Sequence, residues 1–463
     1  MISQLFKITL YLSFIVCSLS IATNNEVFPD YIVVVDAGSS GSRANLFHLI
    51  RDSAGVTTEV KQMGQFPTTP GISSFESHPE DAWDSLYPIL RLCENEIDPN
   101  SILNTPVYIF ATAGMRVLSK SSQKRIYHNI YTHYLKSDIK LYIDESMLKT
   151  IDGEEEAVYG WITVNILKHR ITPSMTLQSN EKTVAAIDLG GESTQISFKL
   201  PDPHEKAGDP INIQKDIHKK SYLFFGAKEA LNRYELYIAN IYKSANHTIP
   251  SPCFNKNYRG THPLLEGVTF IGTGNCQQIL QYLSKGDSPC QTEKCALWSD
   301  PLPDFQGEYV GMSMYFFSLD SLHVYLPAFP FPVTTIKDIY QYSNQFCSME
   351  NKDVYEQFGD KHKYTAKDTI HQRCFHLSWI YTLLHSGYHL SDDAKIYVGK
   401  DIDNTPIDWS FGAAVYMGNN SIPYHSSHYL ILSIVVIVLI IFTVFMCRRN
   451  KVSYVPIKKS LLD

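Results

Sequence analysis

The sequence predicts an α/β protein with two lobes, and three observations lead to this fold class. The chain has 463 residues, which is more than one ordinary hydrophobic core accommodates. Residues 31–42 read YIVVVDAGSSGS and residues 183–195 read TVAAIDLGGESTQ, so an apolar strand, an aspartate and a glycine-rich turn occur twice. Strand-like and helix-like segments alternate between the two copies, as in α/β proteins. We therefore expect two closely joined lobes with a cleft between them.

The remaining elements are expected from the spacing of apolar residues. Short apolar runs predict strands at residues 45–50, 107–112 and 196–200. Apolar residues at helical spacing predict helices at residues 81–97, 120–135, 154–167, 227–244 and 276–284.

Hydrophobic segments at the two ends indicate the compartment. Residues 429–447 carry no charge and would span about 28 Å as a helix, close to the thickness of the hydrocarbon core of a bilayer. Basic residues follow at once, so the positive-inside rule predicts a transmembrane helix with residues 448–463 in the cytosol. A buried soluble helix is the alternative. Residues 1–23 are expected to be a signal peptide or an N-terminal membrane anchor, and the residues between are then lumenal or extracellular.

The cysteines fit an oxidising compartment. Six of the nine lie in the second half of the chain, without the paired spacing that is typical of a zinc site. Disulfides are therefore the expected state, although six cysteines allow many pairings. Asn246 and Asn419 begin N-glycosylation sequons on the predicted lumenal side. The six cysteines are Cys253, Cys276, Cys290, Cys295, Cys347 and Cys374.

The charge balance and composition exclude several classes of protein. The chain has 40 Lys and Arg residues against 47 Asp and Glu, which gives a formal net charge of −7. A protein that binds nucleic acid by neutralising phosphates would usually be more basic. With 44% hydrophobic residues the chain is too apolar for disorder, and it has neither a collagen repeat nor a sustained heptad.

The two glycine-rich turns are candidate phosphate-binding loops. A turn of small residues after a strand lets backbone N–H groups converge on a phosphate, because no side chain blocks the approach. Residues 37–42 (AGSSGS) fit this description, with serine hydroxyls as further donors, and residues 189–193 form the second turn. Asp36 and Asp188 precede the turns, and carboxylates there suit a hydrated divalent cation that bridges phosphate oxygens.

An acidic run at residues 152–156 (DGEEE) supplies candidates for the group that deprotonates a water molecule. Glu154 and Glu155 are explained by the positive end of the helix dipole at the start of a predicted helix. Glu156 is a catalytic candidate if its side chain faces the cleft, which periodicity does not decide.

Five segments in this order resemble the conserved regions of the apyrase, or nucleoside triphosphate diphosphohydrolase, family. They are VVDAGSSGSR (34–43), FATAGMR (110–116), GEEEAVYGWITVN (153–165), DLGGESTQ (188–195), and a fifth region spread over GTGNC (272–276) and WSFGA (409–413). The resemblance covers roughly residues 30–424. It implies an actin/hexokinase-like fold, an RNase H-like duplicate with a mixed sheet in each lobe and the active site in the cleft. The N-terminal lobe would be residues 30–152, with residues 401–424 returning to it, and the C-terminal lobe residues 153–400.

The resemblance also implies roles for individual residues. Glu156 falls at the position of the family's catalytic base, and Thr112, Ser193 and Gln195 fall where family members help to position the metal or the attacking water. Direct in-line attack by water, without a phosphoenzyme, is the implied mechanism. The residues implied to hold Ca²⁺ or Mg²⁺ through water are Asp36 and Asp188. The implied phosphate-binding residues are Ser39, Ser40, Gly41, Ser42, Arg43, Gly190 and Gly191.

The chain departs from the family pattern at three places. Ala157 follows the expected base where glycine is usual, and Glu192 stands in the second phosphate loop where a small or apolar residue is usual. Cys93 lacks the partner of an early disulfide and is expected to be a buried free thiol. The family's habit of pairing neighbouring cysteines implies the disulfides Cys253–Cys276, Cys290–Cys295 and Cys347–Cys374.

Several features are similar to Golgi and lysosomal members of the family. The first loop reads SGSR, and residues 371–388 (HQRCFHLSWIYTLLHSGY) look like that branch. The tail contains Tyr454-Val455-Pro456-Ile457, which a sorting adaptor would bind as an extended peptide. We therefore expect residence in a Golgi or endo-lysosomal membrane rather than the plasma membrane, where the membrane segments would also allow a homo-oligomer. Tyr315 and Phe316 fall near the family's aromatic platform for the base, but core packing explains them slightly better.

Two other kinds of function remain open on the sequence. Sugar kinases and chaperone ATPases share a fold with two phosphate loops, and a non-catalytic nucleotide-binding surface protein would have the same loops. The lumenal placement, the clustered cysteines and the acidic run favour a membrane-anchored, metal-dependent hydrolase that removes the terminal phosphate from nucleoside tri- or diphosphates. Phosphate release from nucleotide without an acceptor distinguishes this function from the others.

Overall fold

The computed structural model describes residues 28–420, apart from residues 180, 243–247, 263–264, 286–289 and 293. Residues 29–419 form one compact unit. In the part of the chain that the structure describes, no helix has the length and apolar character needed to cross a membrane. The expected segments at residues 1–23, 429–447 and 448–463, and the sequon at Asn246, lie outside the described residues.

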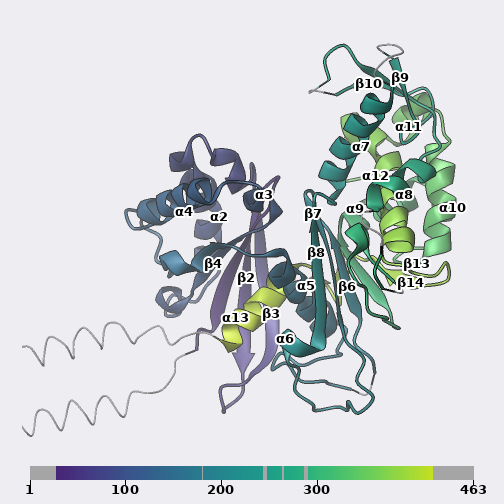
Figure 1. Cartoon of the computed structure of the whole chain (residues 1–463). Coiled ribbons are helices and arrows are strands. Elements are labelled where there is room, and N and C mark those ends of the chain that lie inside the picture. The colour runs from purple at the N-terminus through teal and green to yellow at the C-terminus, as the bar shows by residue number, and fades with distance from the viewer. Residues whose placement is uncertain are drawn as a thin grey trace, which may run out of the picture. The chain divides into compact units, whose positions relative to one another are not determined.

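The N-terminal lobe is built on a five-stranded mixed sheet with the order β3-β2-β1-β4-β5. Its strands are β1 (Tyr31–Ala37), β2 (Ser42–Arg51), β3 (Thr57–Thr68), β4 (Val107–Ala111) and β5 (Leu148–Thr150). The first three form an antiparallel meander, and β4 and β5 continue the sheet in parallel with β1. Helices α2 (Ala82–Asn95) and α4 (Lys120–Tyr134) cover one face, with the short α3 (Ala113–Arg116) at its edge (Figure 1).

The C-terminal lobe repeats this arrangement in a six-stranded sheet with the order β13-β14-β12-β6-β7-β8. Here β6, β7 and β8 form the antiparallel meander, and β12 and β14 continue in parallel with β6. The strands are β6 (Ala185–Leu189), β7 (Ser193–Lys199), β8 (Ile217–Leu223), β12 (Tyr309–Ser313), β13 (Val333–Thr335) and β14 (Lys395–Tyr397). The repeated strand order confirms the duplication and the two-lobed α/β fold that the sequence predicts.

Two helices lie between the sheets and join the lobes (Figure 1). Helix α5 (Gly153–Leu167) packs on β6, β7 and β8, helix α13 (Trp409–Asn419) packs on β1 and β2, and the two helices contact each other. A Cβ at Gly412 would lie 2.0 Å from the carbonyl oxygen of Tyr159, so only glycine allows this close approach. Almost every side chain of α5 is buried because both its sides are covered, which explains why it lacks an amphipathic pattern.

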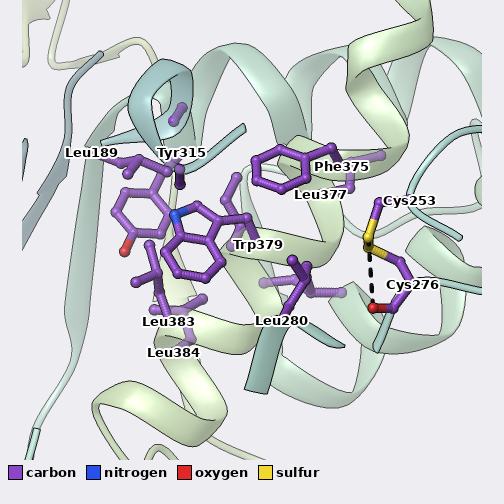
Figure 2. Packing of buried hydrophobic residues seen from close by; sticks show 14 of the residues in the cluster. Leu189, Cys253, Cys276, Leu280, Tyr315, Phe375, Leu377, Trp379, Leu383 and Leu384 are labelled. Carbon is purple, nitrogen blue, oxygen red and sulfur yellow. Dashed lines mark hydrogen bonds between the residues drawn. A yellow bond between two sulfur atoms is a disulfide. The ribbon is translucent and has the colours of Figure 1, made fainter. Parts of the chain in front are cut away.

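The remaining elements of the C-terminal lobe are mostly helices, and they pack around the hydrophobic core of this lobe. Figure 2 shows Trp379 in the middle of this core, with Tyr315 on one side and the Cys253–Cys276 disulfide at its edge. The indole N–H of Trp379 donates to the carbonyl oxygen of Phe225, so the burial of this polar group is compensated. The helices are α6 (Ile213–Asp216), α7 (Ala227–Ile241), α8 (Gln277–Ser284), α9 (Met314–Tyr325), α10 (Ile336–Cys347), α11 (Asn351–Phe358) and α12 (Arg373–Tyr381). Smaller sheets consist of β9 (Thr248–Ser251), β10 (Arg259–Thr261) and β11 (Thr269–Gly272), and of β15 (Asp401–Ile402) and β16 (Thr405–Pro406).

The cysteines pair as the family resemblance implied. The disulfides are Cys253–Cys276, Cys290–Cys295 and Cys347–Cys374. Cys93 is a free, buried thiol on α2, and burial raises its pKa to about 12.

Tyr315 and Phe316 belong to the core of the C-terminal lobe. Tyr315 is fully buried and Phe316 nearly so. The core interpretation of these two residues is therefore correct, and neither lines the cleft described below.

Candidate active site

The two glycine-rich turns are equivalent hairpin loops, one in each lobe. The N–H of Gly38 donates to the carbonyl oxygen of Gly41 at 2.9 Å between β1 and β2, and the N–H of Gly190 donates to that of Ser193 at 2.9 Å between β6 and β7. A Cβ at Gly191 would lie 3.0 Å from Oγ of Ser39, so the two loops face each other closely. Together they line one cavity of about 770 Å³.

This cavity brings together most of the site residues that the sequence predicts. The lining residues from that set are Asp36, Ser39, Ser40, Arg43, Thr112, Glu156, Asp188, Gly190, Gly191 and Ser193. Gly41 and Ser42 do not line it. Ser42 is the first residue of β2 and is fully buried, and its hydroxyl has no hydrogen-bond partner among the described residues. Gln195 lies behind the cavity wall, where it contacts Glu156.

Arg43 lines the cavity and also contacts two carboxylates. Its Nη2 donates to Asp36 Oδ2 at 2.5 Å, and its Nε lies 3.9 Å from Asp408 Oδ2. Positions 36 and 43 are opposite each other in the β1–β2 register, which explains the first contact. Burial raises the pKa of Asp36 to about 6, although Arg43 lowers it in part.

Asp188 occupies the position in β6 that Asp36 occupies in β1. Burial raises its pKa to about 6, and a hydrogen bond from Ser313 counteracts this shift in part. Its Oδ1 is buried and has no hydrogen-bond partner among the described residues. The negative charge of Asp408 raises the pKa values of both Asp36 and Asp188. The sequence did not single out Asp408, which comes from a distant segment just before α13.

These acidic residues suit a divalent cation. Oxygen is the preferred ligand of Ca²⁺ and Mg²⁺, and the buried, unpaired oxygen of Asp188 is available to such an ion or to its water molecules. Desolvation raises the pKa values of both aspartates, so a positive charge beside them would stabilise their ionised forms. Within the described ranges no group of three or more Asp, Glu, His or Cys side chains is arranged to ligate a metal directly.

Glu156 faces the cleft, which distinguishes it from the two acidic residues before it. It lies in the first turn of α5, is 8% exposed, and accepts hydrogen bonds from Nη2 of Arg116 and, at 3.2 Å, from Nε2 of Gln195. Burial raises its pKa to about 8, an effect that Arg116 partly offsets. Glu155 instead completes a capping box with Asp152.

A hydrogen-bond network connects Glu156 to both lobes. Nε2 of Gln195 also donates to Oγ of Ser193 at 2.8 Å and to Oγ of Ser221 at 3.1 Å. Arg116, from α3 in the N-terminal lobe, donates to the same Ser221 at 3.4 Å. Arg116 ends the segment FATAGMR (110–116), but no sequence feature indicates its contact with Glu156, and Ser221 on β8 has no local sequence signal.

The remaining N-lobe residue expected in the site is Thr112. It lies between β4 and α3, and its backbone N–H donates to the carbonyl oxygen of Ala37 at 3.2 Å. This bond ties the end of β4 to the first phosphate loop and directs Thr112 toward the same cavity.

Glu192 has a positively charged partner. Its Oε1 lies 3.1 Å from Nζ of Lys228, the second residue of α7. The acidic side chain in the second loop therefore forms an ion pair, and its repulsion toward an anionic ligand is reduced.

The side chain of Asn419, which begins the second sequon, forms two hydrogen bonds within the fold. Nδ2, the atom that would carry a glycan, donates to the carbonyl oxygen of Pro173 at 2.6 Å, and Oδ1 accepts from Thr57 at 2.9 Å. A glycan would replace one of the two Nδ2 hydrogens of Asn419, and its attachment there stays a prediction from the sequence.

The chain is similar to known proteins in both fold and sequence. The fold is similar to that of the nucleoside triphosphate hydrolases from Neospora caninum, with a TM-score of 0.59 over 89% of this chain and 99% of that chain at 15% identity. The chain is 26% identical to the Golgi apyrase of Schizosaccharomyces pombe, over 84% of this chain and 75% of that protein. It is also 26% identical to the ectonucleoside triphosphate diphosphohydrolase 2 of Gallus gallus, over 91% and 92% of the two chains. Residues 21–427 match the model of one protein family. The chain therefore belongs to the GDA1/CD39 (nucleoside phosphatase) family.

Proposed function

We propose that this protein removes the terminal phosphate from nucleoside tri- and diphosphates by direct attack of water. The observation that carries the proposal is the position of Glu156, a buried carboxylate that lines the same cavity as both phosphate loops. The names of the relatives, which include apyrases and diphosphohydrolases, support the same class of substrate.

The two loops bind the phosphates in this proposal. Gly190 and Gly191 present backbone to the cavity without side chains, and the hydroxyls of Ser39, Ser40 and Ser193 add donors. Because one loop comes from each lobe, a chain of two or three phosphates would be held between them.

Glu156 is the general base. Its carboxylate accepts a proton from water as the water oxygen bonds to the terminal phosphorus, and the bond from that phosphorus to the bridging oxygen breaks. The shortened nucleotide leaves with the bridging oxygen, and inorganic phosphate is the second product. Gln195 orients the carboxylate, and Thr112 and Ser193 are placed to position the water.

Asp36 and Asp188 would hold a divalent cation, with Asp188 offering its unpaired oxygen. Bound Ca²⁺ or Mg²⁺ supplies positive charge that offsets the charge of the phosphate oxygens. Arg43 maintains the orientation of Asp36 through their hydrogen bond.

We further propose that the catalytic unit is lumenal and membrane-anchored, in a Golgi or endo-lysosomal membrane. The uncharged segment at residues 429–447, the three disulfides and the Golgi apyrase relatives support this location. Replacing Tyr454 by Ala should raise surface abundance on unpermeabilised cells if an adaptor reads the tail. A wild-type protein that is already mostly at the surface would contradict the location.

The test of the reaction is phosphate release from ATP, ADP, UTP, UDP and GDP by the purified full chain, with Ca²⁺ or Mg²⁺ and with excess chelator. We expect phosphate from at least one nucleotide without any acceptor, and none with chelator. A kinase would require an acceptor, and a nucleotide-binding protein without activity would release nothing.

A further inference from the structure

Ser313 lines the cavity but has no role in the reaction described above. Strand β12 ends at Ser313 and helix α9 begins at Met314, so the chain changes from strand to helix at a single residue. β12 lies between β6 and β14, and Ser313 is opposite Leu189, which directly follows Asp188. Ser313 therefore lies at the end of the sheet where the second phosphate loop begins.

The backbone of Ser313 is strained. Its φ of 56° and ψ of −117° lie in a region that residues other than glycine rarely adopt. The turn is so sharp that a Cβ at Gly311 would lie 2.9 Å from the Cβ of Tyr315, so glycine is needed there. Tyr315 is fully buried in the core of the C-terminal lobe, which Figure 2 shows, and its packing fixes the start of α9. Strain of this kind is concentrated at functional sites, where the surrounding structure maintains it.

The internal duplication gives Ser313 a counterpart in the N-terminal lobe. β4 runs parallel to β1 as β12 runs parallel to β6, and a helix directly follows each of β4 and β12. The N-cap residue of the helix is Thr112 in the first lobe and Ser313 in the second. Each lobe thus has a hydroxyl side chain at the same strand-to-helix junction, and both residues line the cavity. Because Thr112 is a candidate for positioning the metal or the water, the equivalence indicates a related task for Ser313.

The hydroxyl of Ser313 donates a hydrogen bond to the carboxylate of Asp188. Oδ1 of Asp188 has no hydrogen-bond partner among the described residues, so the acceptor is Oδ2. The bond fixes the rotation of the carboxylate and leaves Oδ1 available to a cation or to one of its water molecules. Asp36, the equivalent of Asp188 in the N-terminal lobe, is oriented by Arg43 instead.

We propose that Ser313 is a positioning residue of the reaction, whose hydroxyl orients Asp188 for the divalent cation. The unusual backbone conformation sets the direction of the Cβ of Ser313 and so aims the hydroxyl at this carboxylate. The inference rests on the proposed function, because it concerns the cation of the same site. It goes beyond that function by assigning a residue that acts through Asp188 and needs no contact with the nucleotide.

The direct test measures cation binding without turnover. The wild-type full chain and the variant Ser313→Ala are titrated with Ca²⁺ alone, and calorimetry gives the two Kd values. We expect the variant to bind Ca²⁺ about tenfold more weakly, because loss of a hydrogen bond to a metal-holding group typically has an effect of this size. If binding without nucleotide is too weak to measure, the Ca²⁺ concentration for half-maximal phosphate release gives the same comparison. Equal values in the two proteins would overturn the proposal.

The variant Ser313→Gly separates the hydroxyl from the backbone strain. Glycine adopts this conformation freely, so its Tm should lie above that of Ser313→Ala. It also lacks the hydroxyl, and its affinity for Ca²⁺ should be as low as that of Ser313→Ala. Wild-type affinity in Ser313→Gly would contradict the role of the hydroxyl.

The matched control is Ser321→Ala on the same helix. Ser321 is fully buried outside the cavity, and its hydroxyl donates to the carbonyl oxygen of Ser318 at 2.6 Å. This variant also loses a hydroxyl from the C-terminal lobe, and its affinity for Ca²⁺ should equal that of the wild type. A loss as large as that in Ser313→Ala would mean that general loosening of the lobe, rather than the contact with Asp188, weakens cation binding.

Kinetics separate a positioning role from direct contact with the nucleotide. In Ser313→Ala a higher Ca²⁺ concentration should recover most of the lost activity, and KM for the nucleotide at saturating Ca²⁺ should equal that of the wild type. A KM that stays raised at saturating Ca²⁺ would mean that Ser313 binds the nucleotide itself, and the positioning role would be wrong. Weaker Ca²⁺ binding in the calorimeter supports the inference even if no nucleotide is hydrolysed, in which case only the proposed reaction fails.

Discussion

Replacing Glu156 by Gln removes the proposed base and leaves the side chain almost unchanged in size. Loss of a general base costs about 10²–10⁴-fold in rate, which corresponds to about 3–5 kcal/mol in the activation barrier. We expect kcat to fall by that factor while KM changes little, because the residues that line the phosphate loops are unaffected. Phosphate release under saturating nucleotide and cation measures kcat, and its dependence on nucleotide concentration measures KM.

The fold should survive this substitution. A glutamine oxygen can still accept from Arg116, the principal partner of Glu156. Burial raises the pKa of Glu156 to about 8 in the folded state. The folded state therefore binds this proton more tightly than the unfolded state, and ionisation lowers the free energy of unfolding as pH rises toward 8. Glutamine does not ionise and escapes this loss, so by circular dichroism its Tm should be close to that of the wild type at acid pH and should lie above it at pH 8.

The matched control is Glu155→Gln, one position earlier in the same turn. Glu155 forms an ion pair with Lys149 at 2.7 Å and is more than one-third exposed, so its loss affects only local stability, by about 0–1 kcal/mol. This variant should keep most of its activity. Full activity in Glu156→Gln, or a collapse of activity in Glu155→Gln with the fold intact, would refute the assignment of the base.

Three further predictions concern the cation, the pH dependence and the free thiol. Asp188→Asn should raise the Ca²⁺ or Mg²⁺ concentration needed for half-maximal activity as well as lower kcat, and undiminished turnover of the wild type in excess chelator would remove the cation from the mechanism. Because Glu156 must be ionised to accept a proton, kcat/KM should rise about tenfold per pH unit and level off near pH 8, so that a flat profile below pH 8 would contradict its role. Cys93, whose pKa burial raises to about 12, should stay unlabelled by a thiol reagent in the native protein and become labelled on unfolding, as mass spectrometry of its peptide would report.

The phosphate loops and the duplication could be predicted from the sequence because they are local patterns. A glycine-rich turn after an apolar strand is visible in a dozen residues, and its repetition predicts a second, equivalent lobe. The matching strand orders of the two sheets and the matching bonds of Gly38 and Gly190 follow from that repetition. The prediction that Glu156 is the catalytic base came from the family resemblance.

The rest of the site depends on contacts between distant segments. Three glutamates occupy one turn of α5, and only the packing of that helix between the sheets determines that Glu156 faces the cavity. Arg116 and Asp408 approach the site from α3 and from the segment before α13, and no periodicity brings them together. The same holds for Lys228, whose ion pair with Glu192 is set by the start of α7.

The side chain of Arg51 connects the two ends of the described folded unit. Its Nη1 donates to the carbonyl oxygen of Pro29 at 2.7 Å, and its Nη2 donates to that of Gly418 at 3.2 Å. One side chain thus connects Pro29, at the start of the folded unit, with Gly418 near its end, and both residues belong to the N-terminal lobe. The C-terminal lobe is, in topological terms, an insertion with no chain end of its own. A force applied at either end of residues 29–419 would therefore act on the N-terminal lobe, where Pro29 and Gly418 lie.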